Sequence, residues 1–151
     1  MRNLITSVLT IVGLSLFSGN AKANECELTI EANDMMQFST KTLSAPKSCE
    51  EVTVTLKHTG KLAATTMGHN WVLTKSEDVK AVATDGMSAG AQNSYVKPND
   101  NRVIAFSEVI GGGEQTSVTF STKGMSDSQS YSFFCSFPGH FSIMQGTFSL
   151  K

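Results

Sequence analysis

Short stretches in which apolar and polar residues alternate recur along most of this chain. In the clearest of them Val52, Val54, Leu56 and His58 alternate with polar neighbours, and this period of two predicts a strand with one buried face. Clusters of Gly, Asn, Asp, Lys and Ser separate such runs and predict turns between them. Many short strands joined by turns favour an all-β fold in which two sheets pack as a sandwich. The runs that we interpret as strands are 28–30, 36–38, 52–58, 69–74, 103–110, 116–121, 131–136 and 146–150.

Two segments between these runs have a different pattern. Residues 76–90 have the pattern of a helix, because Ser76 is a candidate N-cap and Val79 and Val82 lie three residues apart. We expect this helix to be an excursion between two strands. Residues 111–113 are consecutive glycines, but no Gly-Lys-Ser/Thr follows them as in a phosphate-binding loop. We interpret them as a hairpin turn.

The N-terminus has the features of a secretory signal peptide. Arg2 precedes an apolar stretch at 4–17, and Ala21-Lys22-Ala23 matches a small-x-small cleavage site. The alternative is a membrane anchor, but 14 helical residues span only about 21 Å, less than the roughly 30 Å of a hydrocarbon core. We therefore expect cleavage after Ala23, which removes residues 1–23 and leaves residues 24–151 as one domain outside the cytoplasm.

The charge balance limits the classes of partner. The chain has 151 residues with 12 Lys and Arg against 13 Asp and Glu, a formal net charge of −1. This excess is too small for a protein that binds nucleic acid or a charged membrane surface. We expect a monomer with no nucleic-acid partner and no segment inserted in a membrane.

Three cysteines in an exported domain allow one disulfide and leave one thiol. Cys26 and Cys49 lie near the start of the domain without a histidine close in sequence, and we expect them to form the bridge. Cys135 lies instead in an aromatic run that leads through a Pro-Gly turn to His140. One interpretation of Cys135 is a buried thiol that packs as a small hydrophobic side chain. The other is a metal ligand.

Four potential metal ligands belong to two segments of the chain. Cys135, His140 and Met144 fall within ten residues, and His69 stands at the start of the predicted strand 69–74. Two imidazoles and a thiolate with a weak axial thioether are the donors of a blue copper site. Zinc is the main competing metal, since it also binds Cys and His. The methionine and the redox-useful thiolate favour copper as the working metal.

The sequence around these ligands resembles that of the azurins, bacterial periplasmic members of the cupredoxin family. The resemblance rests on Cys-Ser-Phe-Pro-Gly-His at 135–140 with Met144, and on Met-Gly-His-Asn-Trp-Val-Leu at 67–73, and it extends over the whole chain after the signal peptide. It implies an eight-stranded Greek-key β-sandwich with one appended short helix, and it implies that the Cys26–Cys49 bridge is the family's disulfide. Ser136, where Thr is common, and Phe141, where a small residue is common, depart from the family pattern but remove no donor.

The same resemblance implies which residues hold the metal, one type 1 copper ion. His69, Cys135 and His140 are the implied equatorial ligands. Met144 is the implied distant axial ligand, and the backbone carbonyl of Gly68 is a second axial neighbour.

The resemblance also assigns roles around the ligands. It implies that the Asn70 side chain ties the two ligand loops together, and that backbone N–H groups near Asn70 and Phe137 donate to the Cys135 sulfur. Electrons would enter and leave through His140, whose far edge we expect to reach solvent, at the centre of an apolar patch for brief contacts with partners. We expect at least two members of this patch to be buried. The patch maps to Met36, Leu62, Met67, Met87, Phe137, Pro138 and Gly139.

The function implied by the resemblance is the transfer of single electrons in the periplasm, without enzyme activity. The implied partners are c-type cytochromes and periplasmic reductases or dehydrogenases. A copper enzyme such as a nitrite reductase is a first alternative, but it would need further histidines for a second copper site. A periplasmic copper carrier or storage protein is a second alternative, although exposed sites rich in Met and Cys are typical of that class.

His58, the third histidine of the chain, lies on the inward face of the 52–58 strand. We interpret it as a partly buried side chain whose ring nitrogens bind backbone groups, and not as a metal ligand. A role as a pH sensor remains open, because the reference pKa of histidine lies near neutrality.

Overall fold

The computed structural model describes residues 25–151. The predicted signal peptide, its cleavage after Ala23 and the start of the domain at residue 24 lie outside the described residues. Within the described part, no helix has both the length and the apolar character needed to cross a bilayer.

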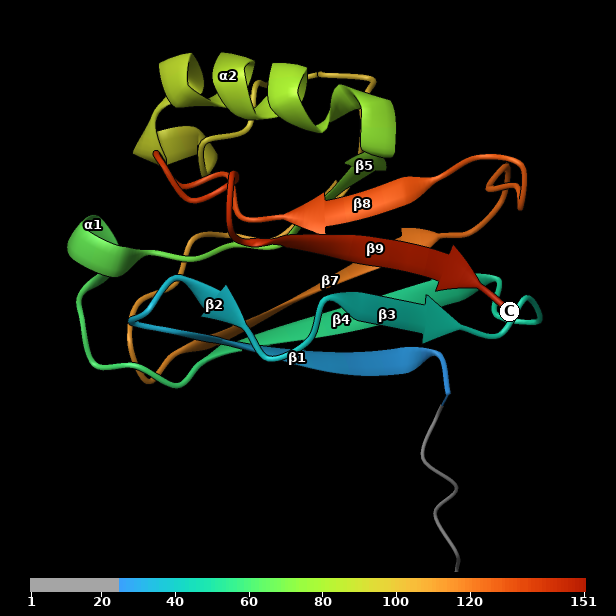
Figure 1. Ribbon diagram of the computed structural model, residues 1–151, viewed down its shortest axis with the longest axis horizontal. Helices are drawn as coiled ribbons and strands as arrows, with labels where there is room; N and C mark the ends of the chain where they lie inside the picture. The colour runs from blue at the N-terminus through green and yellow to red at the C-terminus, as the bar shows by residue number, and fades with distance from the viewer. Residues whose placement is uncertain (1–24) are drawn as a thin grey trace, which may run out of the picture.

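Two β-sheets face each other in this part of the chain (Figure 1), so the predicted sandwich is confirmed. The first sheet has the strand order β2-β1-β4-β7, and the second has the order β3-β9-β8-β5-β6. The pairs β1–β4 and β3–β9 are parallel, whereas the other pairs are antiparallel. The strands of the first sheet are β1 (Glu27–Asn33), β2 (Gln37–Phe38), β4 (Glu51–His58) and β7 (Gln115–Ser121). Those of the second are β3 (Thr42–Ala45), β5 (Val72–Lys75), β6 (Val103–Phe106), β8 (Tyr131–Phe134) and β9 (Gln145–Leu150).

Residues 25–151 contain one strand more than the eight expected. The additional strand is β3, which pairs with β9 along four residues. Only Leu43 and Ala45 of β3 are buried, and two inward residues are too few for a visible alternation in the sequence. By contrast, every second residue of β4 from Val52 to His58 is buried, as its period of two predicts.

Alternation along the central strands creates two separate cores. Leu73 of β5 and Phe133 of β8 point between the sheets, where Trp71 stacks with Phe120 at a ring distance of 5.9 Å. Their neighbours point to the other side of the second sheet and belong to a smaller cluster under the helix α2. Members of that cluster are Val72, Val79, Val82, Ala83, Val96 and Phe134.

Helical segments lie between β4 and β5 and between β5 and β6. The first is the short α1 (Ala64–Met67), which the sequence did not indicate. The excursion between β5 and β6 consists of η1 (Ser76–Asp78), α2 (Val79–Ala89) and η2 (Ala91–Asn93), which confirms the predicted helix (Figure 1). The predicted cap is wrong: Asp78 is the N-cap residue of α2, and the Ser76 hydroxyl instead hydrogen-bonds to that of Ser132 at 2.8 Å.

Three predicted strands are shorter than expected at the same end of the sandwich. β5 begins only at Val72, β6 ends at Phe106, and β8 ends at Phe134. His69 and Cys135 therefore lie in loops, although His69 still forms an isolated antiparallel bridge with Ile110.

The three glycines at 111–113 form a turn, but the predicted hairpin is wrong. The turn leads from the bridge at Ile110, beside the second sheet, to β7 in the first sheet. A connection between two sheets has no shared ladder that would make it a hairpin.

The predicted disulfide is confirmed, because Cys26 and Cys49 are bonded with a Cα–Cα distance of 5.7 Å. Cys26 directly precedes β1, and Cys49 lies two residues before β4. In Figure 1 these strand starts are at the right, opposite the loops that follow β8 and precede β5. Cys135 is a free, buried cysteine at that other end.

Candidate metal centre

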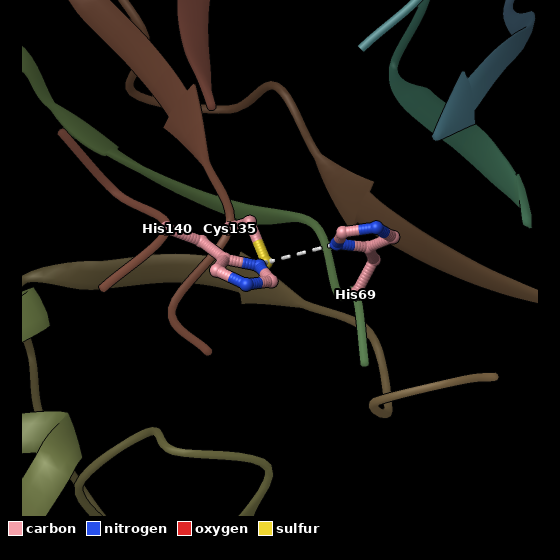
Figure 2. A group of neighbouring side chains, drawn as sticks. All are labelled: His69, Cys135 and His140. Atoms are coloured by element: carbon pink, nitrogen blue, oxygen red, sulfur yellow. Dashed lines mark hydrogen bonds between the residues drawn. The ribbon is translucent and has the colours of Figure 1, made fainter. Parts of the chain in front are cut away.

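Two loops bring His69, Cys135 and His140 together (Figure 2). Their donor atoms all lie within 4.8 Å of one another. The Cys135 Sγ is 3.8 Å from Nδ1 of His69 and 3.6 Å from Nδ1 of His140. Each of the three residues is at most 4% exposed. A thiol and two imidazoles thus face a common point that solvent barely reaches.

The loop after β8 places two of these donors and Met144. The Cys135 N–H donates to the carbonyl of Met144 at 3.0 Å, and the Met144 N–H donates to the carbonyl of His140 at 2.8 Å. Gly139 has φ of +86°, a conformation that glycine adopts without the penalty of a side chain. The backbone therefore folds His140 back toward Cys135, and Met144 is buried beside them just before β9.

His69 comes from the other loop, and a backbone contact orients its ring. Nε2 of His69 lies 2.8 Å from the carbonyl oxygen of Asn33, at the end of β1. A carbonyl can only accept, so Nε2 carries the proton and Nδ1 keeps its lone pair. That lone pair is on the nitrogen nearer to Cys135 Sγ, which is the tautomer that a metal ligand requires.

Burial sets the protonation states of these groups. Desolvation lowers the pKa of His69 to about 4 and also lowers the pKa of His140, so both imidazoles are neutral at pH 7. Burial raises the pKa of the Cys135 thiol to about 12, while hydrogen bonds from the backbone N–H groups of Asn70 and Phe137 oppose that rise. Two neutral imidazoles beside a thiol that needs a cation to ionise fit a soft metal ion.

Asn70 joins the two loops directly. Its side-chain amide donates through Nδ2 to the hydroxyl of Ser136 at 2.8 Å, and its Oδ1 accepts the backbone N–H of Ser136 at 2.8 Å. Asn70 follows His69 in the sequence and Ser136 follows Cys135. The two hydrogen bonds therefore link the residues next to two of the donors.

Gly68 is packed so closely that it tolerates no side chain. Its carbonyl oxygen is 3.9 Å from Cys135 Sγ. A Cβ on Gly68 would lie 2.3 Å from the Ala64 carbonyl oxygen and 2.5 Å from the Val109 side chain. The absence of a side chain therefore allows this carbonyl to approach the donor cluster.

His58 is bound by backbone groups on both ring nitrogens, as the sequence analysis predicted. Nε2 lies 2.9 Å from the carbonyl of Met67, and Nδ1 accepts the N–H of Gly60 at 3.0 Å. The residue is only 2% exposed, so its burial is more complete than expected. Its ring packs on that of His69 with a centroid distance of 4.5 Å.

The residues of the predicted apolar patch are exposed to different degrees. Leu62 and Met87 are 42% and 44% exposed, and Pro138 and Gly139 are exposed as well. Met36, Met67 and Phe137 are half-buried, so the expectation that at least two members are buried is met only in part. His140 is 4% exposed, less than we expected for its far edge.

Sequence reasoning missed three residues near this surface and this centre. Met35 is 68% and Ile143 is 52% exposed, and both line a groove of about 540 Å³ with Met36 and Phe38. The adjacency of Ile143 to Met144 was a signal for this position. The third is Ser94, whose carbonyl accepts from Asn70 Nδ2 at 2.9 Å and from the Ser136 hydroxyl at 3.0 Å. No sequence signal indicates this backbone contact.

Comparison with known proteins places the chain in a family. A family model described as copper binding proteins, plastocyanin/azurin family, matches residues 24–151. An azurin from Achromobacter denitrificans is 52% identical over 148 residues, which are 98% of this chain and 99% of that protein. An azurin from Alcaligenes faecalis is 57% identical over 125 residues, covering 83% and 98%. The solved structure of azurin Az-iso2 from Methylomonas sp. strain J matches with a TM-score of 0.81 at 52% identity, covering 83% of this chain and 98% of that one.

The matched segments cover nearly the full length of these relatives. The donor cluster has the composition of a blue copper site. The chain belongs to the plastocyanin/azurin family of copper-binding proteins, and it is a blue copper protein that transfers electrons with copper as its cofactor.

Proposed function

We propose that His69, Cys135 and His140 are the equatorial ligands of one type 1 copper ion, with Met144 and the carbonyl of Gly68 in axial positions. The mutual distances of the three donors and the lone pair on Nδ1 of His69 support this ligand set. The burial of Met144 and the close approach of Gly68 support the axial pair. The bound copper supplies a one-electron couple between Cu(I) and Cu(II).

The residues of the chain support this one-electron couple by keeping the donor atoms in fixed positions. Cys135 loses its proton when the site is filled, because a coordinated thiol is deprotonated. The N–H groups of Asn70 and Phe137 then donate to a thiolate. The Nε2–H of His69 donates to the carbonyl of Asn33, so His69 keeps the same tautomer in both oxidation states. Donor residues held in this way would move little between the two oxidation states.

Electrons pass through His140 in this proposal. Within residues 25–151 its Nε2 has no hydrogen-bond partner, while its Nδ1 faces Cys135. The Phe137 ring packs against His140 with a centroid distance of 4.7 Å, and the exposed Pro138 and Gly139 lie between them in sequence. The resemblance to azurins implies an apolar patch around this edge, and such a patch would suit contacts that form and separate quickly.

The protein works as a monomer in the periplasm, after export and cleavage behind Ala23. The signal-like N-terminus and the Cys26–Cys49 disulfide support an oxidising compartment. Its partners are c-type cytochromes and periplasmic reductases or dehydrogenases, and it catalyses no reaction of its own. Storage or delivery of copper is disfavoured because all three close donors are buried.

The observation that carries this proposal is the convergence of two neutral imidazoles on one buried thiol. Adding Cu(II) to the purified protein tests it. We expect an intense thiolate-to-copper absorption band toward the red end of the visible spectrum, which disappears and returns on reduction and reoxidation. Weak, pale absorption alone would contradict a type 1 site, and irreversible transfer of the metal to an apo-acceptor would favour the carrier.

A further inference from the structure

The carbonyl of Ser94 is a third point of attachment for the two ligand loops. It accepts one hydrogen bond from Nδ2 of Asn70 at 2.9 Å and another from the hydroxyl of Ser136 at 3.0 Å. The other proton of the Asn70 amide goes to the same Ser136 hydroxyl. The three residues thus form a closed ring of hydrogen bonds in which both amide protons and the hydroxyl proton are used.

An unusual backbone conformation directs this carbonyl. Ser94 and Tyr95 both have φ of +52°, in the left-handed region that residues other than glycine rarely adopt. The Ser94 N–H donates to the carbonyl of Ala91 at 2.9 Å, and the Ser94 hydroxyl accepts from the Val109 N–H at 3.3 Å. Strain of this kind persists only where the surroundings hold it in place.

Helix α2 supplies that support through a glycine. A Cβ at Gly86 would lie 2.0 Å from the Tyr95 carbonyl oxygen and 2.9 Å from its carbonyl carbon. Since both atoms are backbone, the contact cannot be relieved by turning a side chain. Beside Gly86, Asp85 pairs with Arg102, which also pairs with Asp100 at the far end of the same loop.

We propose that the segment Ser94–Tyr95, pressed against Gly86 of α2, is a positioning element of the copper centre. The Ser94 carbonyl accepts hydrogen bonds from the amide of Asn70 and the hydroxyl of Ser136 and holds both groups in place. These two residues in turn fix the backbone N–H groups around the Cys135 sulfur. The helical excursion therefore has a function at the metal centre, although none of its residues is a ligand. This inference depends on the proposed ligand set in one respect only, namely that the residues being positioned are copper ligands.

Two substitutions of Ser94 separate the backbone conformation from the side chain. Asn tolerates the left-handed region, whereas β-branched Val does not. Amide hydrogen exchange of Ser136, whose N–H is bound by Asn70, reports the ring directly. In the Cu(I) protein we expect Ser94→Val to accelerate this exchange by about tenfold or more, and Ser94→Asn by less than about threefold. The amide of Val54 in β4, within the first sheet, serves as the internal reference.

Gly86→Ala tests the support from the helix, with Ser88→Ala on the exposed side of α2 as its matched control. Alanine favours a helix over glycine, so faster exchange at Ser136 in Gly86→Ala alone identifies the contact with Tyr95 as the cause. Equal acceleration at Ser136 and Val54 would mean general destabilisation and would overturn the proposal. Unchanged exchange at Ser136 in Ser94→Val or in Gly86→Ala would overturn it too.

The same exchange measurement on the metal-free protein keeps this result apart from the copper assignment. If the wild type lacked the intense blue band but showed the predicted difference between Ser94→Val and Ser94→Asn, the ligand set would be wrong and the positioning ring would stand. A blue wild type without that difference would support the ligand set and overturn the positioning ring.

Discussion

The two ends of the sandwich use cysteine in different ways. At one end Cys26 and Cys49 are bonded to each other before the first residues of β1 and β4. At the other end Cys135 is reduced, fully buried and flanked by two imidazoles. β4 runs eight residues between them, and at about 3.3 Å per residue that separates the ends by roughly 25 Å.

This separation keeps the free thiol away from the disulfide. Exchange with a disulfide requires a thiolate that reaches one of the sulfur atoms. Cys135 has a raised pKa in the metal-free protein and lies at the opposite end from the only disulfide formed by residues 25–151. Distance and burial therefore keep the structural bridge and the free thiol of Cys135 from exchanging partners.

The largest effect that distinguishes the two ends is expected for Cys135→Ser. A hydroxyl cannot replace the thiolate, so the intense absorption band should vanish completely on addition of Cu(II). The fold should persist, because Cys135 forms no bridge. Visible absorption and circular dichroism measure both outcomes. An intense band in this variant would remove Cys135 from the metal centre.

The reverse result is expected for Cys26→Ala combined with Cys49→Ala. The bridge closes a sequence separation of 23 residues, and its loss should lower the free energy of unfolding by about 3 kcal/mol. The absorption band should be unchanged because the bridge is far from the ligands. Denaturant unfolding and the copper spectrum check this pair, and a shifted band would show that the two ends are coupled.

The ligand end should also make the metal-free protein sensitive to acid. The pKa of His69 is lowered to about 4 by burial, so between pH 6.5 and 4 the unfolded chain binds a proton that the folded protein excludes. Stability is therefore full above pH 6.5 and falls as the pH decreases toward 4, by at most about 3 kcal/mol. In His69→Gln this part of the fall should be absent from unfolding curves. An identical pH profile in the variant would contradict the assignment.

A charge on the apolar patch should slow electron self-exchange, whereas the same charge at the disulfide end should not. Met87→Lys brings two like charges together when two patches meet, and we expect a decrease of roughly tenfold at low salt. Ser130→Lys, at an exposed position directly before β8, is the matched control. NMR line broadening gives both rates at fixed ionic strength. Equal rates in both variants would exclude the patch as the contact surface.

The smallest change is expected for Met144→Leu. Removing a weak axial donor disfavours Cu(II) more than Cu(I), so the reduction potential should rise while the blue colour largely remains. Voltammetry of the variant and the wild type gives the difference. A lowered potential would argue against an axial role for this buried methionine.

Much of the fold could be predicted from local patterns. The alternation in β4 predicted its buried face, and Val79 and Val82 predicted the covered face of α2. Strand β3 and the short α1 could not be predicted, because two or four residues give no periodic signal. The turn at 111–113 was assigned to the wrong kind of connection, since glycines indicate a turn but not which sheets it joins.

The sequence by itself determined which donor types are available and that three of them share one short loop, because Cys135, His140 and Met144 are close in the chain. Only the tertiary structure decided how they are used. The Asn33 carbonyl selects the tautomer of His69, which is 36 residues away in the sequence. The Ser94 carbonyl holds Asn70 and Ser136, which are 24 and 42 residues away from it in the sequence. Any residue has a carbonyl, so the identity of the residue carries no signal for such contacts. They exist because packing of the two sheets and of α2 brings distant backbone segments within hydrogen-bonding distance.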